Sequence, residues 1–232
     1  MNILAIGCHP DDVEINCAGT LAKCVKRGDK VIVCHACNGN MGHEVIMPDE
    51  LRQIRAAEAK KAGSLAGIEV ITCDIGDLLA NSGDMKQRDK VIDVIRYAQP
   101  DLIITHAPSD YMCDHVALSR LVYDASFAAS VPHYGTGKAS KVTPVYYMDN
   151  LGGHGFVPTE YVDITDTFEL KMQMLECHES QLKWMREHDH IDFADFVRTT
   201  AKYRGLQCGV PYAEAFCQVY AYSKVLPKRL LP

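Results

Sequence analysis

The chain has 232 residues, 47% of them apolar, and a net charge of −6, which is enough to bury a full hydrophobic core. Its lysines and arginines are dispersed and form no basic patch, so nucleic acid is not an expected partner. No segment approaches the roughly 18 apolar residues that a membrane span needs, and the first residues read as a strand rather than a signal peptide. We therefore expect a cytoplasmic protein without a membrane partner.

Apolar strand-like runs alternate with amphipathic helical stretches through the first two thirds of the chain. The expected strands are 2–8, 30–37, 69–74, 101–107 and 142–148, and the expected helices are 14–27, 49–65, 84–98 and 115–130. The strands are continuous hydrophobic runs, which is typical of a parallel sheet covered on both faces. This alternation predicts an α/β fold with a Rossmann-like, doubly wound, mostly parallel sheet.

The last third of the chain follows a different pattern. We expect a strand at 161–165, a long helix at 166–187, a second helix at 192–204 and a closing strand at 214–223. No repeat, low-complexity tract or linker separates this part from the rest. The sequence therefore predicts one domain, 1–232, in which a helical elaboration follows the sheet.

Ten cysteines occur in a chain that is neither small nor marked for export. They lie mostly in apolar segments, so buried, reduced thiols are expected rather than a disulfide framework. Cys34 and Cys37 have the spacing of a redox or zinc motif, but no second such pair completes a four-thiolate site.

The turn His9-Pro10-Asp11-Asp12 directly follows the first expected strand. It crowds an imidazole and two carboxylates, and neighbouring carboxylates raise one another's pKa unless a cation screens them. The pattern indicates a metal site or an acid–base site, the alternative being a strand exit in which Asp12 caps the next helix. A dinucleotide site is excluded because the glycine-rich fingerprint is absent and the carboxylates would repel a pyrophosphate.

The topology of such a sheet places a second segment beside this turn. Ligands bind at the carboxyl ends of the strands where the strand order reverses, and in the usual order the first and fourth strands are neighbours there. The fourth strand is followed by Asp114-His115 at the start of a helix, so His9, Asp12 and His115 should meet. Two imidazoles and a carboxylate suit a catalytic Zn²⁺, although non-haem Fe²⁺ uses the same ligands.

Several short motifs together resemble the PIG-L/LmbE-type zinc-dependent N-deacetylases over most of the chain. In chain order they are His9–Asp12, Gly19-Thr20-Leu21-Ala22, Arg55-x-x-Glu58, Asp114-His115, Asp163-Ile164, Lys171, His178-Glu179-Ser180-Gln181, Arg204-Gly205 and Tyr212–Phe216. Each motif is weak alone, but their order and spacing are specific.

The resemblance implies that His9, Asp12 and His115 bind one zinc ion and that Asp11 is the general base. A zinc ion lowers the pKa of bound water towards about 7 and polarises the amide carbonyl. Asp11 would accept the proton of the attacking water and pass it to the departing amine. Asp114 is expected to hold the imidazole of His115 by a hydrogen bond, or else to cap the helix.

One departure from the family pattern is Met112, where many members carry a histidine three residues before the ligand matched by His115. That histidine is often assigned to assist the leaving group or to stabilise the oxyanion, and methionine can do neither. His154, His43 or Tyr111 could supply the missing function. Alternatively, zinc and Asp11 carry the reaction alone.

Four residues are candidates for substrate binding: Arg55, Asp77, His154 and His178. Arg55 resembles a family substrate-binding arginine, although an i,i+3 ion pair with Glu58 is an equal alternative. Asp77, on a loop after the third strand, suits a sugar hydroxyl or a simple turn. His178 either lines the pocket or is a satisfied helix histidine.

The sequence thus predicts a zinc hydrolase that removes an N-acyl group, in the first place acetyl, from a small polar amine such as an amino sugar or its conjugate. The alternatives are a metal-dependent amidase on a non-sugar small molecule, a metal-binding homologue without turnover, and an oxidative Fe²⁺ enzyme. One zinc per chain is expected, with another divalent cation such as Fe²⁺ as the alternative. The resemblance also implies a homo-oligomer, a trimer or a hexamer.

Overall fold

A seven-stranded sheet forms the centre of the computed structural model, which describes residues 1–225 and 228–232. The strands are β1 (Asn2–Gly7), β2 (Lys30–Cys37), β3 (Glu69–Ile75), β4 (Leu102–Thr105), β5 (Val145–Met148), β6 (Glu160–Asp163) and β7 (Ala213–Gln218). Their order is β3-β2-β1-β4-β5-β7-β6, with β7 antiparallel to β5 and β6 and the other pairs parallel. The mostly parallel α/β sheet and the pairing of β1 with β4 are as predicted.

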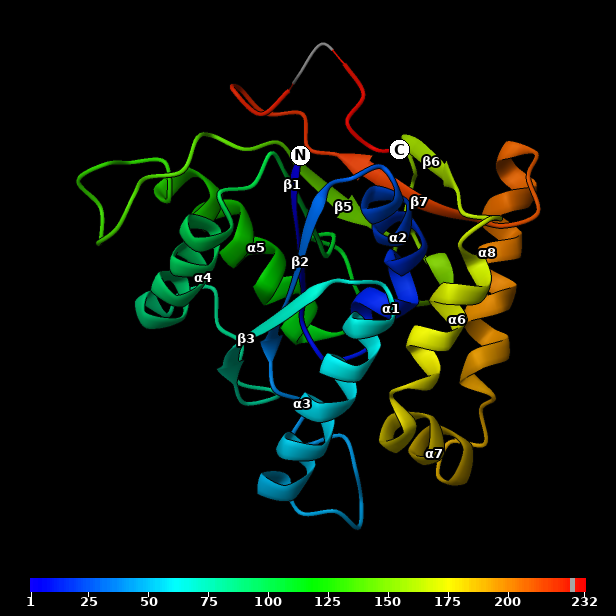
Figure 1. Cartoon of the computed structure of the whole chain (residues 1–232). Coiled ribbons are helices and arrows are strands. Elements are labelled where there is room, and N and C mark those ends of the chain that lie inside the picture. The colour runs from blue at the N-terminus through cyan, green and yellow to red at the C-terminus, as the bar shows by residue number, and fades with distance from the viewer. Residues whose placement is uncertain (226–227) are drawn as a thin grey trace.

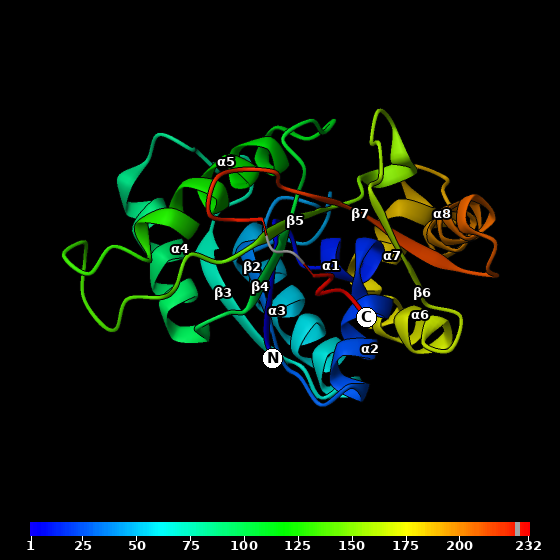
Figure 2. The same cartoon turned by 90° about the horizontal axis from the view of Figure 1, so that it is seen from above.

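Helices cover both faces of this sheet (Figure 1). They are α1 (Asp12–Asn16), α2 (Ala18–Lys26), α3 (Pro48–Leu65), α4 (Met85–Ala98), α5 (Cys113–Ala128), the 3-10 turn η1 (Leu151–Gly153), α6 (Phe168–Glu176), α7 (Glu179–Glu187) and α8 (Phe193–Cys208). Figure 2 shows α4 and α5 on one side of the sheet and α1, α2 and α6 on the other. Within the described residues, none of the helices is both long and apolar enough to cross a membrane.

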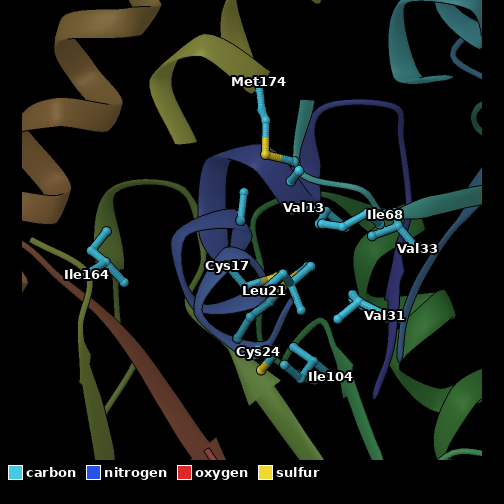
Figure 3. Packing of buried hydrophobic residues seen from close by; sticks show 14 of the residues in the cluster. Val13, Cys17, Leu21, Cys24, Val31, Val33, Ile68, Ile104, Ile164 and Met174 are labelled. Atoms are coloured by element: carbon cyan, nitrogen blue, oxygen red, sulfur yellow. The ribbon is translucent and has the colours of Figure 1, made fainter. Parts of the chain in front are cut away.

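Two hydrophobic cores hold these layers together. Successive strand residues point to opposite faces, so Ile3 of β1 belongs to the core beneath α1, α2 and α6, and Leu4 belongs to the core beneath α4 and α5. Figure 3 shows Leu21 of α2 and the strand residues Val31 and Ile104 in the first of these cores. The burial of both strand faces explains the continuous apolar runs in the sequence.

The helix expected at 14–27 is broken into α1 and α2 at Cys17, whose backbone angles (φ −149°, ψ 5°) are not helical. The break gives α2 its own N-terminus, with N–H groups that lack partners inside the helix. The carboxylate of Glu214 accepts hydrogen bonds from the N–H groups of Gly19 and Thr20, at 3.0 and 2.7 Å. A residue near the other end of the chain therefore caps the start of this helix.

The long helix expected at 166–187 is also two helices, α6 and α7, which are separated at His178 (φ −83°, ψ 57°). The His178 ring is completely buried, and its Nε2 lies 3.3 Å from Oε2 of Glu14 in α1. Packing of this ring beneath α1 accompanies the change in chain direction. The closing strand β7 is shorter than the expected 214–223 because its pairing ends at Phe216 with β6 and at Gln218 with β5.

Lys171 and Glu214 form a buried ion pair at 2.6 Å, and Lys171 also donates to the carbonyl oxygen of Ile15 at 2.7 Å. Replacing Lys171 by methionine leaves the Glu214 carboxylate buried without its cation, so we expect the free energy of unfolding to fall by about 3–5 kcal/mol. Urea denaturation measures this loss. The matched control is Lys183→Met, because Lys183 is exposed on α7 and its surface pair with Glu187 should contribute at most about 1 kcal/mol. Equal losses in both variants would contradict the prediction.

Candidate metal centre

Three of the sequence-predicted residues meet at the carboxyl ends of β1 and β4. Nε2 of His115 lies 3.3 Å from Nδ1 of His9 and 3.3 Å from Oδ2 of Asp12. The third separation, between Nδ1 of His9 and Oδ2 of Asp12, is 3.5 Å. Donor atoms placed tetrahedrally about 2.0–2.1 Å from a zinc ion stand about 3.4 Å apart. The three side chains therefore fit a single zinc-sized ion.

The outer ring nitrogen of each histidine faces a carboxylate. Nε2 of His9 lies 3.1 Å from Oδ2 of Asp114, and Nδ1 of His115 lies 3.1 Å from Oδ1 of Asp110. If each neutral ring donates its single N–H outwards, both lone pairs point inwards towards the Asp12 oxygen. Three acceptor atoms then converge, which is the arrangement that a bound cation stabilises.

Asp114 therefore orients a different histidine from the one expected. It contacts His9 rather than His115, and its Oδ2 also accepts a hydrogen bond from the N–H of Leu78 at 2.7 Å. The reason is geometric, because adjacent residues of a helix point about 100° apart and Asp114 cannot face the ring of the next residue. Asp110, which the sequence analysis did not select, faces His115 instead.

The two carboxylates beside His115 give this position a strongly negative electrostatic potential. Burial opposes a charge on the imidazole, but Asp12 and Asp110 outweigh burial and raise the pKa of His115 to about 10. Burial likewise opposes a charge on Asp12, yet the neighbouring imidazoles of His115 and His106 hold the pKa of Asp12 well below its usual value. The centre thus favours positive charge, which either a proton or a metal ion can supply.

Asp11 stands next to Asp12 in sequence but contacts a different partner. Its backbone φ is 121°, a left-handed conformation whose cost of about 1–3 kcal/mol is typical of functional sites. Its Oδ2 lies 3.1 Å from Nη2 of Arg55. Burial raises the pKa of Asp11 to about 6, although the Arg55 guanidinium acts to lower it. A carboxylate with such a pKa can exchange a proton near neutral pH.

Arg55 is buried behind this carboxylate and also donates hydrogen bonds to the carbonyl oxygens of Pro10 and Gly39. The alternative of an i,i+3 ion pair with Glu58 is wrong. Glu58 instead accepts hydrogen bonds from the N–H and the hydroxyl of Ser180, at 2.8 and 2.7 Å. Arg55 therefore lines the pocket and fixes the position of Asp11.

A pocket of about 240 Å³ opens above the three donor atoms and is also lined by Asp11, Arg55 and Asp77. The two carboxylate oxygens of Asp77 accept hydrogen bonds from the N–H groups of Gly39 and Met41, at 2.8 and 3.0 Å. Asp77 thus anchors the loop between β2 and α3 at the pocket.

The structure does not bring His154 or His178 to this pocket. His154 is exposed in a neighbouring hollow of about 300 Å³, which shares Tyr111 and Leu151 with the metal pocket. His178 lies buried beneath Glu14 and is not among the lining residues. Both residues were selected from local sequence. Local sequence does not show that the loop of His154 faces solvent, or that the break between α6 and α7 buries His178 in the core.

Three residues were proposed as substitutes for the missing histidine: His154, His43 and Tyr111. Of these, Tyr111 lines the pocket, beside Met112. Its ring stands edge-on to the His115 ring, with the centroids 5.8 Å apart. Nδ1 of His43 accepts hydrogen bonds from the N–H groups of Val45 and Ile46, so this histidine organises its own loop.

His106, at the end of β4, is a residue of this centre that the sequence analysis did not select. Its Nε2 accepts a hydrogen bond from the N–H of Cys8 at 3.0 Å and lies 3.3 Å from Oδ2 of Asp12. Its ring stacks on the His115 ring with the centroids 4.0 Å apart. Burial lowers the pKa of His106, with the nearby His115 acting in the same direction. The sequence signal that could have identified His106 was its position directly after β4, at the carboxyl end of the strand beside β1.

We expect Asp110→Asn and Asp114→Asn to weaken zinc binding by about 10–100-fold each, because each removes the charge that orients a ligand imidazole. Competition with a coloured zinc chelator measures the affinity. Asp166→Asn, which changes an exposed surface carboxylate, is the control and should bind zinc as the unmodified chain does. Unchanged affinity in both test variants would contradict these two roles.

Comparisons with known proteins place the chain in a family. Residues 4–126 match the PIG-L family, which is described as GlcNAc-PI de-N-acetylase. Diacetylchitobiose deacetylase from Thermococcus kodakarensis is 27% identical over 220 residues, which cover 91% of this chain and 80% of the relative.

Solved structures with a similar fold belong to more than one kind of enzyme. The N,N'-diacetylchitobiose deacetylase of Pyrococcus horikoshii superposes with a TM-score of 0.82 at 25% identity, covering 94% of this chain and 83% of that one. The 4-carboxy-2-hydroxymuconate hydratase GalB of Pseudomonas putida superposes with a TM-score of 0.84 at 22% identity, covering 99% of this chain and 100% of that one. The second likeness shows a shared fold and no more.

Proposed function

Since the chain belongs to the PIG-L family, we propose that it is a zinc-dependent N-deacetylase that releases acetate from an N-acetylated amino sugar or amino-sugar conjugate. The likeness to diacetylchitobiose deacetylases supports this substrate class. The observation that carries the proposal is the convergence of three acceptor atoms from His9, Asp12 and His115, beside a carboxylate, Asp11, that is held separately. A site that only stored metal would have no use for this extra carboxylate.

A zinc ion held by these three side chains would supply Lewis acidity that activates water and polarises the amide carbonyl. Asp11 takes a proton from the attacking water as the new C–O bond forms. It then delivers that proton to the amine nitrogen as the C–N bond breaks, so that acetate and the free amine leave. Arg55 keeps Asp11 in place, while Asp114 and Asp110 fix the imidazole orientations.

We further propose that Tyr111 contributes the hydrogen bond that is often assigned, in many family members, to a histidine at the position of Met112. A phenol can donate to a developing oxyanion, whereas a thioether cannot. The position of Tyr111 on the pocket wall beside His115 supports this assignment.

Acetate release from N-acetylglucosamine, diacetylchitobiose and a non-sugar N-acetyl amine tests the proposed function. The chain should be inactive after chelation and should recover with about one equivalent of Zn²⁺. Hydrolysis of the non-sugar amide alone would favour the amidase alternative, and bound metal without any hydrolysis would favour a homologue without turnover. Water addition to an unsaturated acid is a useful control reaction, because a hydratase shares the fold.

The native metal and the assembly belong to the same proposal. We propose that zinc is preferred over Fe²⁺, and metal analysis of protein purified without oxygen tests this preference. A homotrimer or homohexamer in the cytoplasm is also proposed, with a small molecule as the partner. Analytical ultracentrifugation of the full chain tests the assembly.

A further inference from the structure

Cys34 and Cys37, which have the spacing of a redox or zinc motif, each contact a different cysteine in the structure. Sγ of Cys37 lies 3.5 Å from Sγ of Cys8, and Sγ of Cys34 lies 3.7 Å from Sγ of Cys73. The pairing of β2 with β3 shifts register between His35 and Cys37, and both β2 cysteines belong to the core beneath α4 and α5. The motif is therefore divided between two buried thiol pairs.

The two thiol pairs have different surroundings. An imidazole and a carboxylate adjoin the pair of Cys8 and Cys37, and one ligand atom from each of the four side chains lies within 4.8 Å of the others. Among the described residues, no histidine or acidic residue completes such a group with Cys34 and Cys73. The group beside the first pair is called the thiol cluster and consists of Cys8, Cys37, His9 and Asp114.

His9 belongs both to the thiol cluster and to the metal centre described above. Its Nδ1 lies 3.3 Å from Nε2 of His115, whereas its Nε2 lies 3.1 Å from Oδ2 of Asp114. The two nitrogens of an imidazole point in different directions, and each can bind a metal ion when it carries no proton. One ring can therefore face two cations at the same time.

The distances within the thiol cluster fit a tetrahedral thiolate site. Zinc–sulfur bonds of about 2.3 Å place two sulfur atoms about 3.8 Å apart, and bonds of about 2.0–2.1 Å place a nitrogen and an oxygen about 3.4 Å apart. The corresponding separations are 3.5 Å between the sulfurs of Cys8 and Cys37 and 3.1 Å between Nε2 of His9 and Oδ2 of Asp114. Thiolate ligands favour soft cations over magnesium or calcium.

The thiol cluster is buried directly behind the metal pocket. Cys8 and Cys37 are 0% exposed, and the side chains of Asp114 and His9 are 2% and 12% exposed. Of the four, only His9 lines the metal pocket, so an ion enters past its ring. Within the described part of the chain, the ion-pair partner of Asp114 is this imidazole and not a lysine or arginine. A cation here would therefore meet a buried carboxylate that no permanent positive charge neutralises.

We propose that the thiol cluster is a second cation site, which binds a thiophilic divalent ion such as Cd²⁺ or a further Zn²⁺. As the ion binds, each sulfur exchanges its S–H bond for a bond to the metal, and Nε2 of His9 exchanges its N–H bond in the same way. The protons leave to solvent, and no electron is transferred. Binding at this site does not depend on the proposed deacetylase function.

Cadmium titration of the zinc-loaded full chain tests the site. A phosphine keeps the thiols reduced, and a weak chelator removes cadmium from single exposed thiols such as Cys208. We expect about one Cd²⁺ to bind while about one Zn²⁺ is retained, with the ultraviolet charge-transfer absorption of cadmium–thiolate bonds. A further Zn²⁺ should compete with this Cd²⁺ and remove the absorption.

Alanine variants locate the bound ion. Cys8→Ala and Cys37→Ala should each lower the cadmium affinity by more than about 100-fold, because a lost ligand costs more than a lost orienting group. Cys34→Ala and Cys73→Ala remove a sulfur from the same core and are the matched controls, which should bind cadmium as the unmodified chain does. Circular dichroism establishes that each variant is folded, and either test variant suffices if the other does not fold.

Three results would overturn the proposal. The first is cadmium binding without thiolate absorption, and the second is replacement of the zinc ion by cadmium one for one. The third is an equal loss of cadmium affinity in the test and control variants, because the effect would then come from core packing.

The shared histidine has a consequence for hydrolysis, which rests on the proposed function. Acetate release from diacetylchitobiose should fall as the thiolate absorption develops, because His9 then loses the hydrogen bond to Asp114 that orients its ring. Full activity with the second ion bound would show that the ion does not use His9. A chain that never hydrolyses the amide would remove the proposed function, whereas the absorption titration would still decide the cation site.

Discussion

Replacing Asp11 by asparagine lowers kcat for acetate release by about 10²–10⁴-fold while about one zinc per chain is retained, which is the range typical of a lost general base. Asparagine preserves the shape of the side chain but cannot accept the proton of the attacking water. It also tolerates the left-handed backbone that Asp11 adopts, at φ 121°, better than most residues do. The proposed zinc donors His9, Asp12 and His115 are unchanged, so metal content should not fall.

The assay measures acetate release and zinc content on the same protein sample. Asp166→Asn, a surface substitution of the same type, should retain the activity of the unmodified chain. An Asp11→Asn protein with full activity would remove Asp11 from the mechanism. Loss of zinc in that variant would instead assign Asp11 to the metal centre.

Replacing His115 by alanine should reduce zinc content from about one per chain to near zero and abolish hydrolysis. The change removes one of three donor atoms and leaves only His9 and Asp12. We expect its effect on zinc affinity to exceed the roughly 10–100-fold effect of losing a carboxylate that only orients a ligand. Zinc titration followed by calorimetry measures the affinity.

His154→Ala is the matched control for this second prediction, because it removes an exposed histidine that lies outside the metal pocket. It should bind zinc normally. Circular dichroism of the His115→Ala protein establishes that the fold survives. Unchanged zinc affinity in this variant would show that the three side chains do not share an ion.

The fold was predictable where the local pattern and the tertiary environment agree. Strands such as β1 and β4 are continuous apolar runs because both sheet faces are covered, and the usual strand order then placed them side by side. The two broken helices were not predictable. Each break is accompanied by a contact with a remote residue. Glu214 contacts the start of α2, and Glu14 contacts His178. The amphipathic pattern of the sequence continues across both breaks.

The sequence by itself determined which side chains meet at the centre, because the His9–Asp12 turn is local and the topology leaves few places for Asp114-His115. Only the tertiary structure decided which carboxylate faces which imidazole, that Arg55 holds Asp11, and that His106 stacks on His115. The physical reason is that these contacts depend on the direction of each side chain. Residue types and strand order fix which segments meet, whereas the rotation of each helix and the packing around it fix where each side chain points.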